Sequence, residues 1–245
     1  MKIASFALSD VGRVRRENQD SSGHFPDRNL FVIADGMGGH QGGKQASEMA
    51  VATISERLAK DSDAGALAER TEHLVDAVRD ANRRIVERGA RESDLNRMGT
   101  TLVALLLQHD EAAIVHVGDS RAYRWRDGRL SQLTTDHTLV ADLLLANEIS
   151  AAEASTHPYR HVLTRALGAA EDVKADVNRL DVRPGDVYLL CSDGVSGMLS
   201  EPEIEAIASA HPDDPQALGR ELIASANQAG GKDNATVIVV RCAAD

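Results

Sequence analysis

Aspartates that border apolar runs are the residues of this sequence that are most clearly able to take part in chemistry. Four of them occur in the contexts Asp35-Gly36, Gly118-Asp119-Ser120, Ser192-Asp193-Gly194 and Lys232-Asp233-Asn234, and Asp20 is a fifth acidic position. Taken singly, an aspartate at a strand end is usually a turn former or a helix cap. If the strands bring these side chains to one edge, however, their charges repel one another unless divalent cations such as Mg²⁺ or Mn²⁺ lie between them.

A glycine-rich loop suggests a different chemistry. The segment LFVIADGMGGHQGGKQASEMA contains G-x-x-x-x-G-K from Gly38 to Lys44, which is the start of a phosphate-binding P-loop. A P-loop needs Ser or Thr as the next residue, to place a hydroxyl on Mg²⁺, whereas this chain has Gln45. A P-loop NTPase, in which VYLLCSD would be the apolar run and the aspartate that hold Mg²⁺, is therefore disfavoured.

The composition limits location and partners. Lys plus Arg number 27 against 38 Asp plus Glu, and the resulting net charge of −11 disfavours nucleic acid and anionic membranes. No apolar run approaches the ~18 residues of a membrane span, and the first residues lack the apolar segment of a signal peptide. Cys191 and Cys242 form neither a disulfide framework nor a zinc set. We therefore expect a cytoplasmic monomer that binds no nucleic acid and no membrane.

The elements that must position the aspartates are mostly strands. The segments that read as strands, each bounded by Gly, Pro, Asp or Asn, are residues 2–8, 30–36, 98–108, 112–119, 122–126, 129–134, 177–182, 186–193 and 235–242. The turns His109-Asp110-Glu111 and Asp127-Gly128 predict hairpins, because they are too short to hold a crossover helix. Antiparallel pairing is therefore expected in the centre of the chain.

Helical patterns fall in pairs between these groups of strands. Two apolar faces in residues 44–89 predict an antiparallel helix pair, the first with Ala46, Met49, Ala50, Ile54 and Leu58 and the second with Leu67, Leu74, Val78, Ala81 and Ile85. Further along, Ser200-Glu201-Pro202-Glu203 has the spacing of a capping box, and DPQALGRELIASANQAG is a second amphipathic helix. The order predicts an α+β fold, with two mainly antiparallel sheets packed face to face between helix pairs in α/β/β/α layers. We expect a single domain over residues 1–245, with a flap-like insertion at about 139–168 of the kind that often covers a site.

Eight short motifs carry a resemblance to a known family. They are, in order, VRRENQD, ADGMGGHQGG, MGTT, VGDSRAY, LTTDH, LTRALG, CSDGVSGMLS and GGKDNATVIVV. The series resembles that of the metal-dependent protein serine/threonine phosphatases of the protein phosphatase 2C (PP2C) type, in their bacterial branch, and it runs from about Val11 to Val240. The resemblance implies a β-sandwich flanked by helices, with a metal cluster at one edge. It also implies hydrolysis of phosphoserine and phosphothreonine by direct attack of a metal-activated water.

The resemblance assigns a metal site to the acidic residues. Asp35 matches the carboxylate that bridges two cations, Mn²⁺ or Mg²⁺, and the Gly36 carbonyl matches another ligand of the pair. Asp193 and Asp233 match the remaining carboxylates, while Asp20 matches the acidic residue that holds metal-bound waters. The glycines of the loop then let the chain turn sharply after Asp35 and let a carbonyl approach a cation.

Two further roles follow from the same resemblance. Asp119, together with Asp193, matches a third and weaker metal position of bacterial members. Arg15 precedes Asp20 by five residues and matches the phosphate-binding arginine, which can hold two phosphate oxygens at once. Lys44 becomes a solvated residue at a helix start.

Two departures from the family pattern concern the metal site and the proton donor. Gln19 stands where many relatives have a metal-site glutamate, and Met37 occupies the place of a histidine proposed as general acid in animal relatives. The leaving-group proton must therefore come from elsewhere, and His40, His137 and a metal-bound water are the alternatives.

Alternative functions are a non-catalytic phosphoprotein-binding module of the same fold and a phosphatase for small phosphorylated metabolites. All five acidic positions are present, whereas a binding module would be expected to lose some of them. A cysteine phosphatase is excluded, because its C-x5-R loop would need Arg where this chain has Gly197. The expected partners are phosphorylated proteins, the substrates of a serine/threonine kinase.

Overall fold

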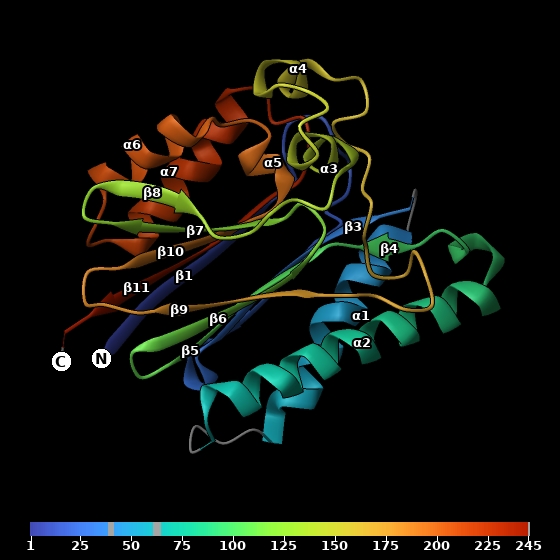
Figure 1. Ribbon diagram of the computed structural model, residues 1–245, viewed down its shortest axis with the longest axis horizontal. Coiled ribbons are helices and arrows are strands. Elements are labelled where there is room, and N and C mark those ends of the chain that lie inside the picture. Colours follow the sequence, from blue (N-terminus) through green and yellow to red (C-terminus); the bar gives the residue numbers. More distant parts are fainter. Residues whose placement is uncertain (39–41, 61–64, 245) are drawn as a thin grey trace.

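Two antiparallel β-sheets packed face to face form the centre of the protein, and a pair of helices covers the outer face of each sheet (Figure 1). This computed structural model describes residues 1–38, 42–60 and 65–244. The layers are those expected from the sequence, so the predicted α/β/β/α sandwich is confirmed.

The first sheet has the strand order β1-β11-β10-β7-β8. Its strands are β1 (Lys2–Asp10), β11 (Ala235–Ala243), β10 (Val187–Cys191), β7 (Arg121–Arg126) and β8 (Arg129–Gln132). The second sheet has the order β2-β3-β5-β6-β9, with the short β4 paired to β3. Its strands are β2 (Asp20–Phe25), β3 (Leu30–Met37), β4 (Gly99–Thr100), β5 (Leu102–Gln108), β6 (Glu111–Val117) and β9 (Asp176–Asp181).

Helices cover both sheets and one end of the sandwich. The pair α1 (Gly42–Arg57) and α2 (Leu67–Arg91) packs on the second sheet, and the pair α6 (Glu201–Ala210) and α7 (Pro215–Gln228) packs on the first. Three shorter helices, α3 (Leu139–Leu145), α4 (Ala151–Thr156) and α5 (Asp193–Ser196), lie near one another at one end (Figure 1). The 3-10 turns are η1 (Pro26–Arg28), η2 (Leu58–Lys60) and η3 (Ser93–Leu95). No helix of the described ranges has the length and apolar character needed to cross a membrane.

The central strands are apolar on both faces because each face packs against a different layer. On β3, Leu30 and Val32 contact α1 and α2, whereas Phe31 and Ile33 point between the two sheets. All four side chains are fully buried. Continuous apolar runs such as LFVIA are therefore required here, although in an isolated antiparallel sheet one face would be polar.

The predicted turns and caps form as expected. Asp127 and Gly128 both have positive φ, 51° and 81°, as a two-residue hairpin turn requires. Ser200 and Glu203 form the capping box at the start of α6. Strand β2 was not predicted, because its sequence, DSSGHF, has almost no apolar residues and lies at a sheet edge.

Candidate metal centre

Strand pairing and strand ends bring four of the five aspartates into one pocket. Asp35 is near the end of β3, Asp119 follows β6, Asp193 starts α5 directly after β10, and Asp233 precedes β11. All four line a pocket of about 500 Å³, together with Gly36 and Arg15. The sequence-based expectation that separate strand ends would meet at one edge is met by this geometry.

Asp20, the fifth acidic residue, lies beside Asp35 but does not line the pocket. The two residues are directly opposite each other in the β2–β3 pair. The hydroxyls of Ser192 and Thr236, which belong to the other sheet, donate to Asp20 Oδ2 at 2.8 and 2.6 Å. Among the described residues, its second oxygen, Oδ1, is buried without a hydrogen-bond partner. One oxygen of Asp20 thus joins the two sheets, and the other is left for a cation or for water bound to one.

Burial and mutual repulsion disfavour the charged form of these carboxylates. Burial raises the pKa of Asp20 to about 6. Burial, and then the charge of Asp193, raise the pKa of Asp119 to about 7. The pKa of Asp35 lies well above its usual value, because the side chain is buried and then because Asp20 and the other three carboxylates repel its charge. The carboxylates therefore need additional positive charge beside them. Their hard oxygen atoms are ligands that fit Mg²⁺ or Mn²⁺.

The chain around Asp35 is fixed by the backbone. Thr101 N and Thr100 Oγ1 donate to the Asp35 carbonyl at 2.9 and 2.8 Å, and Asp35 N donates to Thr101 Oγ1 at 3.0 Å. A Cβ on Gly36 would collide with the backbone carbonyls of Gly43 and Gln19. Only glycine fits at position 36, which explains why Asp35 is followed by glycine near the end of β3.

Arg15 lies at the rim of the same pocket. Its Nη2 donates to Asp233 Oδ2 at 2.6 Å, and the side chain remains 54% exposed. This hydrogen bond raises the pKa of Arg15 above its ordinary value. Of its two neighbours, Arg16 also lines the pocket, whereas Arg13 is exposed outside it. Lys44 is half exposed and 3.5 Å from Glu17, consistent with its expected place at a helix start.

The two departures from the family pattern, Gln19 and Met37, both line the pocket, so neutral side chains stand at those places. Of the histidines proposed as proton donors, His40 lies outside the described residues. His137 is 4% exposed and is absent from the pocket lining. Its Nδ1 accepts from Gly118 N at 3.1 Å, and its Nε2 is 3.3 Å from Asp176. This geometry argues against His137 as general acid and gives it a structural role beside Asp119.

His116, His137 and Asp176 together resemble a second metal site, since their potential ligand atoms lie within 4.8 Å of one another. Their hydrogen bonds oppose that interpretation. His116 Nε2 is 2.8 Å from the Thr135 carbonyl and must donate to it, and both nitrogens of His137 face protein atoms. The rings stack with centroids 4.7 Å apart. The cluster supports the Gly118 turn and needs no ion.

Sequence reasoning missed three residues of the site. His161 lines the pocket from the segment that follows α4, and Ser192 and Thr236 hold Asp20. Ser192 belongs to the motif CSDGVSGMLS, but the sequence indicates for it only a position next to Asp193 at the end of a strand. Its role depends on contacts between sheets, which no local pattern encodes.

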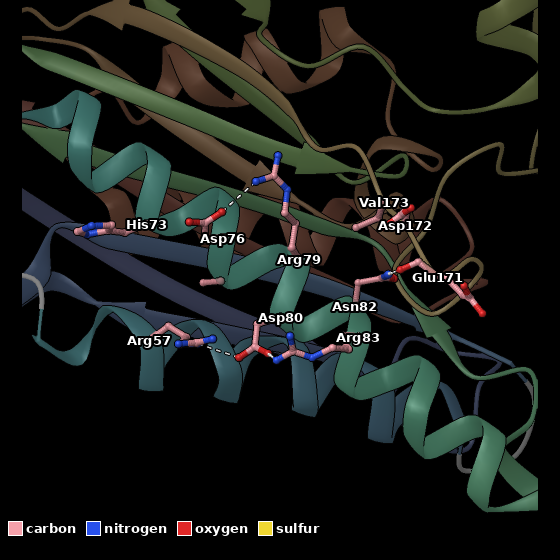
Figure 2. Close-up of a pocket in the computed structure, with 11 residues that line it drawn as sticks. Arg57, His73, Asp76, Arg79, Asp80, Asn82, Arg83, Glu171, Asp172 and Val173 are labelled. Atoms are coloured by element: carbon pink, nitrogen blue, oxygen red, sulfur yellow. Dashed lines mark hydrogen bonds and ion pairs between the residues drawn. The ribbon is translucent and has the colours of Figure 1, made fainter.

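A second pocket of about 670 Å³ lies on the outer side of α2 (Figure 2). Asp80 is buried there, at 3% exposure, and forms ion pairs with Arg57, Arg83 and Arg84. Asn82 donates to the carbonyls of Ala170 and Glu171 at 3.0 and 2.9 Å. The buried carboxylate of this pocket, Asp80, is therefore paired with arginines of the chain itself.

A pocket of oxygen ligands next to a guanidinium suits a reaction in which cations and arginine share the charge of a phosphoryl group. The fold and the site therefore define a metal-dependent phosphohydrolase. Comparison with known proteins narrows this class. The family model described as Protein phosphatase 2C matches residues 13–230, and the chain belongs to this family.

Individual relatives agree with this assignment. The chain is 40% identical over 239 residues to "Serine/threonine phosphatase stp" of Listeria monocytogenes, covering 95% of this chain and 93% of the relative. The crystal structure of Mycobacterium tuberculosis PstP/Ppp matches with a TM-score of 0.90 and 38% identity over 99% of both chains. A structure of the PstP catalytic domain in complex with two manganese ions matches with a TM-score of 0.87 and 36% identity, also over 99% of both chains. The protein is thus a divalent-metal-dependent protein phosphatase.

Proposed function

We propose that the chain hydrolyses phosphoserine and phosphothreonine in proteins, with two divalent cations in the carboxylate pocket. The observation that supports this most strongly is the group of buried aspartates whose pKa values are raised by burial and by one another. Such a group is suited to cations. Its place beside Arg15 suits a phosphorylated substrate.

The residues that would hold the cations are Asp35, Gly36, Asp193 and Asp233, with Asp20 holding water beside them. Asp119 and Asp193 would hold a third, weaker cation. When bound, Mn²⁺ or Mg²⁺ supplies Lewis acidity, which activates water and offsets negative charge on the phosphoryl oxygens. All other steps belong to the residues of the chain.

Arg15 binds the phosphoryl group. A guanidinium carries five N–H donors in a planar fork, and the described contacts of Arg15 use only Nη2. The remaining donors are available to two phosphate oxygens. Since the side chain is half exposed at the rim, it can meet an incoming phosphopeptide before the phosphate reaches the carboxylates.

Cys191 is not suited to act as a covalent nucleophile. It lies in the buried strand β10 at 2% exposure, and burial raises the pKa of its thiol to about 12. A thiol in this environment is inert. In this proposal the nucleophile is water that the cations would activate, and we assign the leaving-group proton to water in the pocket rather than to His137.

The cellular setting is part of the proposal. The substrates are proteins phosphorylated by a serine/threonine kinase, and the enzyme acts as a cytoplasmic monomer. The whole chain forms one phosphatase domain, with residues 139–168 as a flap beside the pocket. The acidic net charge supports a protein that avoids nucleic acid.

Phosphate release from a phosphothreonine peptide, measured with Mn²⁺ and again with excess chelator, tests the proposed function. We expect turnover only with the metal. Peptide binding without phosphate release would support a non-catalytic module instead. Release from small phosphorylated metabolites but not from peptides would point to a metabolite phosphatase.

A further inference from the structure

A second depression adjoins the metal pocket on the side of the flap, which we define as residues 139–168. It has a volume of about 440 Å³ and shares Asp119, His161 and Asp193 with the metal pocket. We call it the flap pocket. The remaining residues that line it are Arg121, Asp136, Thr138, Val140, Ala141, Leu144, Ala151, Ala154, Arg160, Ser196 and Gly197. Because the two depressions share these three residues, a peptide whose phosphate lies among the carboxylates can place a neighbouring side chain in the flap pocket.

The flap side of this pocket is apolar. Val140, Ala141 and Leu144 come from α3, and Ala151 and Ala154 come from α4. These helices lie near α5 (Figure 1), which supplies Ser196 to the pocket lining. An aliphatic side chain that enters would therefore exchange water for apolar contact, which favours binding.

The flap is held in place by backbone hydrogen bonds. Leu139 N donates to the Val162 carbonyl and Thr164 N donates to the His137 carbonyl, both at 2.9 Å. The helix α3 is capped by Thr138, and α4 begins with a full capping box. The pocket is thus already formed in the structure, and little ordering has to accompany binding.

The charged groups that the flap pocket does not share with the metal pocket disfavour a basic occupant. Arg121 and Asp136 neutralise each other through a bidentate pair, with Nε to Oδ1 at 2.9 Å and Nη2 to Oδ2 at 2.7 Å. Arg160 is exposed, and among the contacts of the described residues its guanidinium meets only the His157 carbonyl. A lysine or arginine entering here would meet the positive charge of Arg160, while the carboxylates of Asp119 and Asp193 are those that the proposed function assigns to cations.

We propose that the flap pocket is a substrate subsite that accepts an aliphatic side chain flanking the phosphorylated residue. This proposal rests on the proposed function, because the substrate must be a phosphorylated polypeptide. It adds a selectivity that a metal site and a single arginine cannot provide, since those groups recognise only the phosphate.

The test uses phosphothreonine peptides that differ at one flanking position, which carries Leu, Ala or Lys, with each position near the phosphothreonine varied in turn. At one position we expect kcat/KM for Leu to exceed that for Ala by on the order of tenfold, with Lys the poorest. Ala151→Trp, at an exposed position that lines the pocket, should bring the Leu-to-Ala ratio close to one. Because each ratio compares two peptides with the same variant, a general loss of activity lowers both kcat/KM values equally and leaves the ratio unchanged.

The matched control is Ala152→Trp, one residue further along α4, exposed and outside the pocket lining, which should keep the wild-type ratio. Equal kcat/KM for Leu and Ala peptides at every position, or a preference that survives in Ala151→Trp, would overturn the subsite. Failure of the proposed function has a different signature, namely no phosphate release from any peptide in the presence of Mn²⁺, and that result would overturn both proposals.

Discussion

Two pockets of this protein contain deeply placed carboxylates, and they differ in how the negative charge is balanced. On the outer side of α2, Asp80 is surrounded by Arg57, Arg83 and Arg84, which supply its counter-charge from within the chain (Figure 2). At the edge of the sandwich, Asp35 has other carboxylates as its electrostatic neighbours, and these raise its pKa. The charge of Asp80 is balanced within the chain, whereas the carboxylates around Asp35 require cations from solution.

The comparison shows why pocket size is a poor guide to function here. The pocket beside α2 is the larger, about 670 Å³ against about 500 Å³, yet its buried carboxylate, Asp80, is paired with arginines. The smaller pocket contains the uncompensated charge. Sites that do chemistry are often those where burial and like charges perturb pKa values.

The largest expected effect is the loss of turnover in Asp35→Asn. This change removes a charged ligand from the centre of the cluster. We expect kcat with saturating Mn²⁺ to fall by more than about a hundredfold. A hundredfold loss is the upper end of what is found for residues that only orient a metal ligand, whereas Asp35 is proposed to be a ligand itself. Thermal unfolding of the metal-free variant should show a midpoint no lower than that of the wild type, because the variant has one repulsive charge fewer. Asp233→Asn should behave similarly, and wild-type rates in either variant would remove these residues from the site.

Asp80→Asn should have the opposite profile. It removes the shared acceptor of three arginines, and hydrogen bonds to charged groups contribute about 2 kcal/mol. We expect the free energy of unfolding to fall by about that amount, measured by urea titration, with kcat unchanged. The matched control is Asp76→Asn, an exposed residue of the same pocket whose ion pair among the described residues is with Arg79. Its effect should stay within about 0.5 kcal/mol. Loss of catalysis in Asp80→Asn would show that the two pockets are not independent.

Much of the fold follows from the sequence because local signals agree with it. The positive φ values at Asp127 and Gly128 are those that their residue types favour, and the apolar face of α2 is buried as its periodicity predicts. The polar edge strand β2 was missed because it is defined by pairing with β3 rather than by its own composition.

The site was only partly accessible to sequence reasoning. The aspartates could be recognised, since each ends an apolar run and matches a family motif. The support of Asp20 by Ser192 and Thr236 could not, because it joins residues about 170 and 220 positions apart, on the other sheet. The counter-charge of Asp80 was missed as well, because Arg57 belongs to a neighbouring helix.

A smaller effect is expected at the rim of the metal pocket. Arg15→Lys keeps the charge but loses the planar fork, so KM for a phosphopeptide should rise by on the order of tenfold, or about 1.4 kcal/mol, with metal activation unchanged. Arg13→Ala and Arg16→Ala should raise KM less, and mainly at low ionic strength, because their effect is general steering. Equal, salt-sensitive increases in all three variants would refute a specific phosphate contact at Arg15.

A separate effect, on stability rather than on turnover, is a pH dependence in the metal-free protein. Burial raises the pKa of Asp119 to about 7. A carboxyl whose pKa is raised by folding adds most stability below its unfolded value of about 4, and that stability is lost as pH rises through the folded pKa. The melting temperature of metal-free wild type, relative to Asp119→Asn, should therefore fall between about pH 5 and about pH 8. Calorimetry at both pH values checks this, and an identical pH dependence in the two proteins would contradict it.

Equilibrium dialysis of Mn²⁺ against the metal-free protein near neutral pH measures whether divalent cations complete the aspartate cluster. We expect at least two Mn²⁺ ions to bind per chain, the number in the manganese-containing PstP structure. Asp35→Asn should bind fewer ions, and Asp80→Asn should bind as many as the wild type. Equal Mn²⁺ binding by wild type and Asp35→Asn, or no binding by a fully active wild-type enzyme, would show that divalent cations do not complete the aspartate cluster.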